Sequence, residues 1–184
     1  NKAASEMRSR VEDLIGDCSN MWIMTFHAMC LRMLRIFPEQ IGYQPNFVIY
    51  DTSDQKTLVR NILKEKGISD REFKPQYILA VISKSKEKEK DAEGYRAAEE
   101  ENYKTKAIYT VFKEYEERLK KNNAMDFDDI LLNAVKLFER DEAALLKYQQ
   151  RFHYIMVDEY QDTNHIQYKL IKMLAESHHN LCVV

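Results

Sequence analysis

The chain has 184 residues, 45% hydrophobic and 32% charged, so it can bury a core and does not have a disordered composition. Its net charge of −2 excludes a globally basic nucleic-acid-binding protein, so any such binding has to rest on local groups. Three scattered cysteines without C-x-x-C spacing argue against a disulfide framework or a zinc site. We see no signal peptide and no apolar run near the roughly 20 residues of a membrane span, and we expect a cytoplasmic protein.

Hydrophobic periodicity predicts helices and short extended segments in the first half of the chain. Residues 3–15 have a helical apolar stripe, and "MWIMTF" at 21–26 indicates a short buried strand. A helix follows from Phe26, and residues 46–51 are expected to be extended. Thr52 and Gln55 form a capping-box pattern at the start of the next helix.

The second half alternates long helices with two apolar runs. Residues 84–106 carry balanced charges and no apolar stripe, which favours a mobile or solvated connection. Helices are expected at 108–119 and after Asp126, which, with neighbouring acids, favours a helix N-terminus. A buried strand at 154–157, a helix and the strand-like "NLCVV" form a βαβ pattern. We therefore expect a mainly α fold with a small parallel β component.

Two acids follow the predicted strand at 154–157 directly. Ligands of parallel α/β sheets bind beyond the carboxyl ends of the strands, which is where Asp158 and Glu159 fall. One carboxylate there can hold Mg²⁺ through water, and its neighbour can deprotonate an attacking water. The alternative is that Asp162 and Thr163 cap the next helix and the other acids favour its positive end. The pattern alone leaves both interpretations open.

Several segments resemble one family in the same order. "VDEYQDTN" resembles motif II, the Walker B box, of UvrD/Rep/PcrA-type superfamily-1 DNA helicases. "NKAASEMRSRV" resembles the end of motif Ia, "WIMTFHAMCLRMLR" resembles motif Ib, and "MDFDDIL" and "DTNHIQYKLIKMLA" also match. The resemblance covers essentially the whole chain. It implies an ATP-dependent helicase that moves 3′ to 5′ on single-stranded DNA and unwinds duplexes in repair or replication, with ATP and Mg²⁺ as cofactors.

The resemblance also implies roles for individual residues. Asp158 would serve the Mg²⁺ of ATP, Glu159 would be the catalytic base, and Gln161 would couple the nucleotide site to its surroundings. Contacts to single-stranded or junction DNA would come from Asn1, Lys2, Thr25, Phe26 and His27. Core packing for Phe26, a surface position for His27 and a mobile terminus for the first two residues remain alternatives.

The resemblance implies three parts: residues 1–25 and 152–184 as pieces of a RecA-like P-loop domain, and residues 26–151 as a helical insertion. The chain starts without Met, ends on an apolar run and contains no G-x-x-x-x-G-K-[ST] loop. We therefore expect an internal fragment that is inactive alone and binds neither cofactor by itself. The alternatives are the helicase part of a RecB/AddA-like helicase–nuclease and a non-enzymatic helical module that binds DNA or protein.

Overall fold

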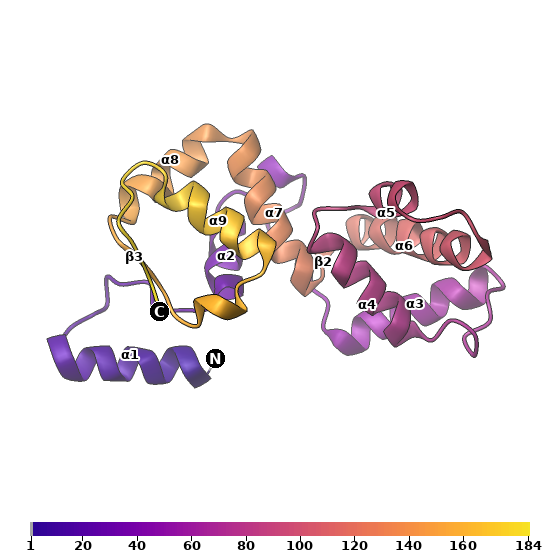
Figure 1. Cartoon of the computed structure of the whole chain (residues 1–184), viewed down its shortest axis with the longest axis horizontal. Coiled ribbons are helices and arrows are strands. Elements are labelled where there is room, and N and C mark those ends of the chain that lie inside the picture. Colours follow the sequence, from indigo (N-terminus) through magenta and orange to yellow (C-terminus); the bar gives the residue numbers. More distant parts are fainter. Residues whose placement is uncertain (1) are drawn as a thin grey trace.

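The computed structural model describes residues 2–184 and is mainly helical, with two short parallel strand pairs (Figure 1). The first half forms α1 (Lys2–Ile15), α2 (Phe26–Leu34), the 3₁₀ turn η1 (Glu39–Ile41), β1 (Val48–Ile49), α3 (Thr52–Glu65) and α4 (Pro75–Lys86). The second half forms α5 (Ala92–Ala98), α6 (Tyr103–Lys121), β2 (Ala124–Met125), α7 (Phe127–Arg140), α8 (Glu142–Arg151), β3 (Ile155–Val157), η2 (Tyr160–Asp162), α9 (His165–Ala175) and β4 (Leu181–Val183). The expected fold class, mainly α with a small parallel β component, is confirmed.

Buried apolar side chains gather in two clusters. The first core lies among α2, η1, α7, α8 and α9, and includes Met33, Leu137 and Leu170. The second core lies among α3, α4, α5 and α6, and includes Ile78 and Val111. Figure 1 shows these two groups of helices as separate lobes, with the start of α7 between them. The relative position of the lobes therefore depends on the segments that cross from one to the other.

The short β1–β2 pair lies at the border of the two cores. Val48 pairs with Ala124 and Ile49 pairs with Met125 in parallel register. Because successive side chains of a strand point to opposite faces, Ala124 enters the second core while Met125 enters the first. Both side chains are fully buried, so this strand anchors each lobe against the other.

Helix caps follow local hydrogen-bonding chemistry and correct one prediction. The N-cap of α3 is Asp51, which forms a capping box with Asp54, so the predicted pair of Thr52 and Gln55 is wrong by one position. Gln55 instead donates to the Tyr50 carbonyl at 3.1 Å. Aspartate is the better N-cap because its carboxylate accepts from two backbone N–H groups at once.

The predicted strand at 21–26 is wrong. Residues 21–25 are irregular, and α2 already begins at Phe26. Trp22 packs edge-on against Phe152, with ring centroids 5.1 Å apart, and the guanidinium groups of Arg32 and Arg151 lie over its ring. These contacts bury apolar side chains in the first core without a β-ladder, so an apolar run was mistaken for a strand.

The prediction that residues 84–106 form a mobile or solvated connection is also wrong. This segment contains the end of α4, all of α5 and the start of α6. Tyr95 is buried in the second core, and the backbone N–H of Ala92 donates to Glu116 at 3.0 Å. The segment lacks an apolar stripe because only a few of its side chains, such as Tyr95, enter the core. Ion pairs such as Glu93–Lys113 hold it in addition.

The βαβ prediction at the end of the chain is confirmed. β3 and β4 pair in parallel, with Met156 opposite Cys182. The expectation that the first strand is buried is wrong for one face, because Val157 is 7% exposed while Tyr154 and Met156 are both 78% exposed. Ile155, on the same face as Val157, packs against the first core. Helix α1 is confirmed as a helix, but none of its described side chains is buried.

Cysteine burial gives a direct test of this packing. We expect an alkylating reagent to modify Cys182 of the exposed β4 while Cys18 and Cys30 stay unmodified in the folded chain. Burial raises the pKa of the Cys30 thiol, which disfavours the reactive thiolate. Peptide mapping by mass spectrometry with and without urea measures the order of modification. Equal labelling of Cys30 and Cys182 without urea would contradict the burial.

Candidate functional site

The acidic segment between β3 and α9, here called the acid loop (residues 158–163), starts at the carboxyl end of the strand pair. The backbone N–H of Tyr160 donates to the Val184 carbonyl at 2.9 Å, and the N–H of Val184 donates to Val157 at 3.0 Å. The loop is thus tied to both parallel strands at their carboxyl ends. This is the edge at which open parallel α/β sheets bind their ligands.

The two leading acids of the loop are exposed and held by short-range contacts. The backbone N–H of Glu159 donates to Asp158 Oδ1 at 3.0 Å, and Gln161 Nε2 donates to Glu159 Oε2. Glu159 has a left-handed backbone with a φ of 52°, which is uncommon for a residue with a side chain. Such conformations cluster at functional sites, where the surrounding structure holds them against their cost.

Neither acid caps the following helix. Asn164 is the N-cap of α9 and forms a capping box with Gln167, so the alternative that Asp162 or Thr163 supplies the cap is wrong. The backbone N–H of Asp162 instead donates to the Glu159 carbonyl at 2.9 Å within η2. Capping therefore does not account for Asp158 and Glu159, and both carboxylates face solvent.

The carboxylates of the acid loop suit a metal ion whose other ligands are water molecules and phosphates. Among residues 2–184, no group of three or more His, Cys, Asp or Glu side chains is arranged to hold a metal ion. A single exposed carboxylate such as Asp158 fits Mg²⁺, which keeps several waters and is usually bound by one or two carboxylates plus nucleotide phosphates. It does not fit Zn²⁺ or Ca²⁺, because these ions need more protein ligands.

The residues predicted to contact DNA are spread over two elements. Asn1 lies outside the described residues, and Lys2 is the exposed first residue of α1. Thr25 is the N-cap of α2 and accepts from the Ala28 N–H at 3.4 Å. Phe26 is half-buried against the first core, which accounts for its apolar character through packing. His27 is the remaining side chain whose position needs a separate explanation.

His27 lies against the first turn of α7. Its ring is edge-on to Phe127, with centroids 6.1 Å apart, while Phe127 itself is 48% exposed. Burial lowers the pKa of His27 below its usual 6.5, although the nearby Asp128 carboxylate and the Phe127 backbone oppose this shift. The imidazole is therefore mainly neutral at neutral pH and can both donate and accept one hydrogen bond.

The His27 pKa predicts a pH effect on folding. Because the folded pKa is below the unfolded one, the unfolded state binds more protons at mildly acidic pH. We expect the free energy of unfolding to fall as the pH drops below about 6.5, by an amount that His27→Asn reduces. NMR titration of the imidazole gives the pKa itself. A midpoint at or above 6.5 would contradict the burial of this ring.

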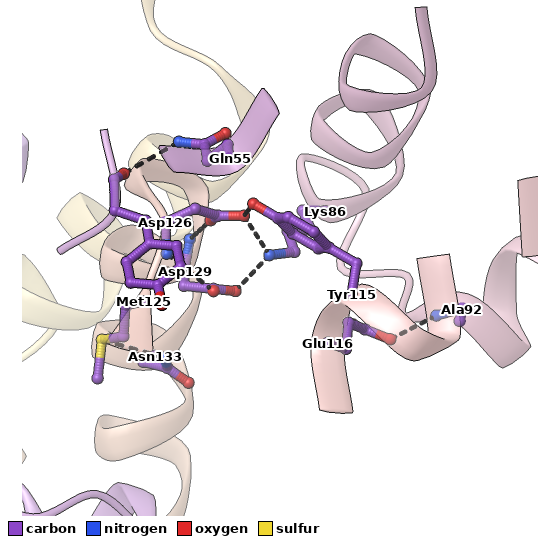
Figure 2. Close-up of polar contacts among 10 residues, drawn as sticks. Gln55, Lys86, Ala92, Tyr115, Glu116, Met125, Asp126, Asp129 and Asn133 are labelled. Carbon is purple, nitrogen blue, oxygen red and sulfur yellow. Dashed lines mark hydrogen bonds and ion pairs between the residues drawn. The ribbon is translucent and has the colours of Figure 1, made fainter. Parts of the chain in front are cut away.

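The sequence did not predict one buried polar cluster. Lys86 is 1% exposed, and its Nζ lies 2.7 Å from Asp126 Oδ2 and 2.7 Å from Asp129 Oδ1 (Figure 2). Tyr115 donates to the same Asp126 oxygen at 3.0 Å. The capping role predicted for Asp126 is confirmed, but no spacing rule links it to a lysine 40 positions away.

The acid loop follows the first strand of a βαβ unit, and parallel α/β sheets bind ligands at the carboxyl ends of such strands. The comparisons give the family. The chain matches the UvrD/REP helicase N-terminal domain over residues 1–184 and belongs to this family. The prediction made from "VDEYQDTN" and the accompanying motifs is confirmed.

Individual relatives agree with this assignment. The chain is 44% identical over 185 residues to the ATP-dependent DNA helicase PcrA of Bacillus subtilis (strain 168). It is 43% identical to the enzymes of the same name from Staphylococcus epidermidis and Staphylococcus aureus. Each alignment covers 100% of this chain and 25% of the relative. The chain thus spans about a quarter of the length of the relatives it matches.

Within residues 2–184, no helix is long and apolar enough to cross a membrane.

Proposed function

We propose that this chain is part of an ATP-dependent DNA helicase that translocates 3′ to 5′ on single-stranded DNA and unwinds duplexes. The observation that carries the proposal is the pair Asp158 and Glu159, which is exposed at the carboxyl end of β3 and not used to cap α9. Family membership and the name shared by the relatives support ATP and DNA as the substrates. DNA repair or replication proteins are the expected partners, and a cytoplasmic location stays a prediction.

The acids have separate roles in this proposal. Asp158 holds Mg²⁺, mostly through water, and the ion when bound neutralises charge on the phosphates of ATP. Glu159 accepts the proton of the attacking water. Gln161 donates to the Glu159 carboxylate and so orients it, which is how this residue links the site to the rest of the acid loop. Asp158, Glu159 and Gln161 lie within four consecutive residues, so the acid loop would form one side of the nucleotide site.

The rest of such a site would come from other parts of the protein. Residues 1–184 contain no phosphate-binding G-x-x-x-x-G-K-[ST] loop. Positioning and charge neutralisation supply most of the catalysis of phosphoryl transfer. We therefore propose that the chain alone hydrolyses ATP at a negligible rate. The RecA-like assignment of residues 1–25 and 152–184, with 26–151 as a helical insertion, stays part of the proposal.

The DNA path is proposed along the start of α1 and α2. Lys2 would contact phosphate, and Thr25 and His27 would contact the backbone. Phe26 contributes less directly, because its ring packs against the first core. The DNA contact predicted for Asn1 rests only on the resemblance to the helicase family. Neutral His27 beside exposed Phe127 offers one hydrogen-bonding group and one aromatic edge on the same face.

A strand-displacement assay on the full-length protein tests the proposed function. With ATP and Mg²⁺, we expect release of the short strand from duplexes with a 3′ single-stranded tail and little release from duplexes with a 5′ tail. Equal release from both, or ATP hydrolysis that single-stranded DNA does not stimulate, would contradict the proposal. Shortened DNA strands in the same gel would favour a helicase–nuclease. Absence of all ATP hydrolysis would favour the non-enzymatic module.

A further inference from the structure

A buried ionic cluster joins the two lobes at the end of α4. We call Lys86, Tyr115, Asp126 and Asp129 the ionic joint. Lys86 and Tyr115 come from helices of the second core, whereas Asp126 and Asp129 form the capping box at the start of α7, whose other residues pack in the first core (Figure 2). Asp126 is 2% exposed and Tyr115 is fully buried. The contact therefore lies between the cores and out of solvent.

Charges in this position restrict geometry more than apolar contacts do. Burial alone would lower the pKa of Lys86, but Asp129 and Asp126 outweigh burial and raise it, so the ammonium stays charged. Burial would raise the pKa of Asp126, and the ammonium outweighs that effect and lowers it. A buried charge that loses its partner is strongly unfavourable, so Asp126 Oδ2 and Asp129 Oδ1 have to stay near Lys86 Nζ. Apolar side chains would tolerate sliding between the lobes.

A second, more exposed set of ion pairs also links the end of α4 to the first lobe. Glu89 follows α4 with a left-handed backbone, at a φ of 57°, which is uncommon for a glutamate. Its carboxylate accepts from Lys169 of α9 at 2.6 Å and lies 3.4 Å from His165 Nε2. Lys169 also lies 2.6 Å from Glu139 of α7. The second lobe is thus tied to α9, which starts directly after the acid loop.

We propose that the ionic joint fixes the orientation of the α3–α6 lobe on α7, and that Lys86 is a positioning residue. The joint also affects the first turn of α7. Asp126 and Asp129 lie on either side of Phe127 in the chain, and the Phe127 ring contacts His27. A fixed joint holds this turn, and with it the His27 ring, in one place. The proposed orientation of the α3–α6 lobe is inferred from the contacts of the ionic joint alone. The effect on DNA rests on the proposed function.

Distance measurements between spin labels test the orientation. Labels are attached at Arg60→Cys on α3 and Lys172→Cys on α9, both exposed positions, in a Cys182→Ser background; Cys18 and Cys30 are buried. The test variant carries Lys86→Met, Asp126→Asn and Asp129→Met, which removes all charge from the joint. Asparagine keeps the N-cap of α7, and replacing a buried ionic cluster by apolar groups is often neutral for stability.

We expect a narrow distance distribution with the native joint and a distribution at least about twice as wide in the uncharged variant, at unchanged helix content by circular dichroism. The second variant, Glu89→Gln with Lys169→Met, changes only the exposed set of ion pairs and does not threaten the cores. It is expected to broaden the distribution less. Equal widths in the native protein and a folded triple variant would overturn the joint. Where the triple variant fails to fold, Asp129→Asn is measured in its place; it keeps the shape of the side chain and removes one of the two carboxylates beside Lys86, and equal widths would again overturn the joint.

A kinetic readout in the full-length protein separates positioning from stability. With Asp129→Asn, which removes one partner of Lys86, we expect a several-fold higher DNA concentration for half-maximal stimulation of ATP hydrolysis, with kcat at saturating DNA unchanged. An unchanged DNA requirement would overturn the positioning role. If the native full-length protein shows no DNA-stimulated hydrolysis, the proposed function fails instead, and the label distances alone decide on the joint.

Discussion

Replacing Glu159 with Gln in the full-length protein is expected to lower kcat for DNA-stimulated ATP hydrolysis by about 10²- to 10⁴-fold, the usual contribution of a general base. The amide matches the carboxylate in shape but cannot accept the proton of the attacking water. Binding of ATP should change little, because the proposed Mg²⁺ ligand is the neighbouring Asp158. A steady-state assay of phosphate release over a range of ATP concentrations measures kcat and KM separately.

Glu176→Gln provides the matched control for this substitution. Glu176 is an exposed glutamate at the C-terminal end of α9, so this change removes the same charge as Glu159→Gln at a position outside the acid loop. We expect its kcat to equal that of the unchanged protein. An E159Q variant that hydrolyses ATP as fast as E176Q would rule out the catalytic-base role. A large rise in KM without a fall in kcat would assign Glu159 to nucleotide binding instead.

Replacing Lys86 with Met alone is expected to lower the free energy of unfolding by about 3–5 kcal/mol, the cost of removing one partner of a buried ion pair. Asp126 and Asp129 would keep their burial and lose the ammonium that lies 2.7 Å from each. Urea unfolding of the 184-residue chain, followed by circular dichroism, gives the difference.

The exposed Arg10–Glu6 pair of α1 is the control for Lys86. Its side chains are 74% and 56% exposed, so water screens the charges and Arg10→Ala should cost well under about 1 kcal/mol. If K86M costs no more than R10A, the joint is not electrostatically important. The triple variant K86M/D126N/D129M should recover much of the loss, since it leaves no unpaired charge.

Local sequence signals predicted the helices better than the strands. Asp126 was placed correctly, because capping depends on few neighbouring residues. The run at 21–26 misled because an apolar stretch of that length fits a strand or an irregular segment equally well. Trp22 reaches the first core through Phe152 and Tyr148, more than a hundred positions away, which periodicity does not reveal.

The acid loop and the ionic joint show the same limit at the level of sites. Asp158 and Glu159 could be proposed from the sequence because they follow an apolar run directly and because the motif around them is specific. Lys86 was missed because it lies in a segment of alternating Lys and Glu, where each charge looks solvated. Its partners are 40 and 43 positions away and are themselves explained by capping. Only packing shows that this lysine is buried among them.

We propose that Asp158 and Glu159 form one wall of an ATP–Mg²⁺ site. Equilibrium binding of a non-hydrolysable ATP analogue to the full-length protein, measured against Mg²⁺ concentration, tests it most directly. With native Asp158, we predict that affinity rises with Mg²⁺, and that Asp158→Asn removes most of this rise while Glu159→Gln retains it. The same Mg²⁺ dependence in the native protein and in D158N would contradict the claim.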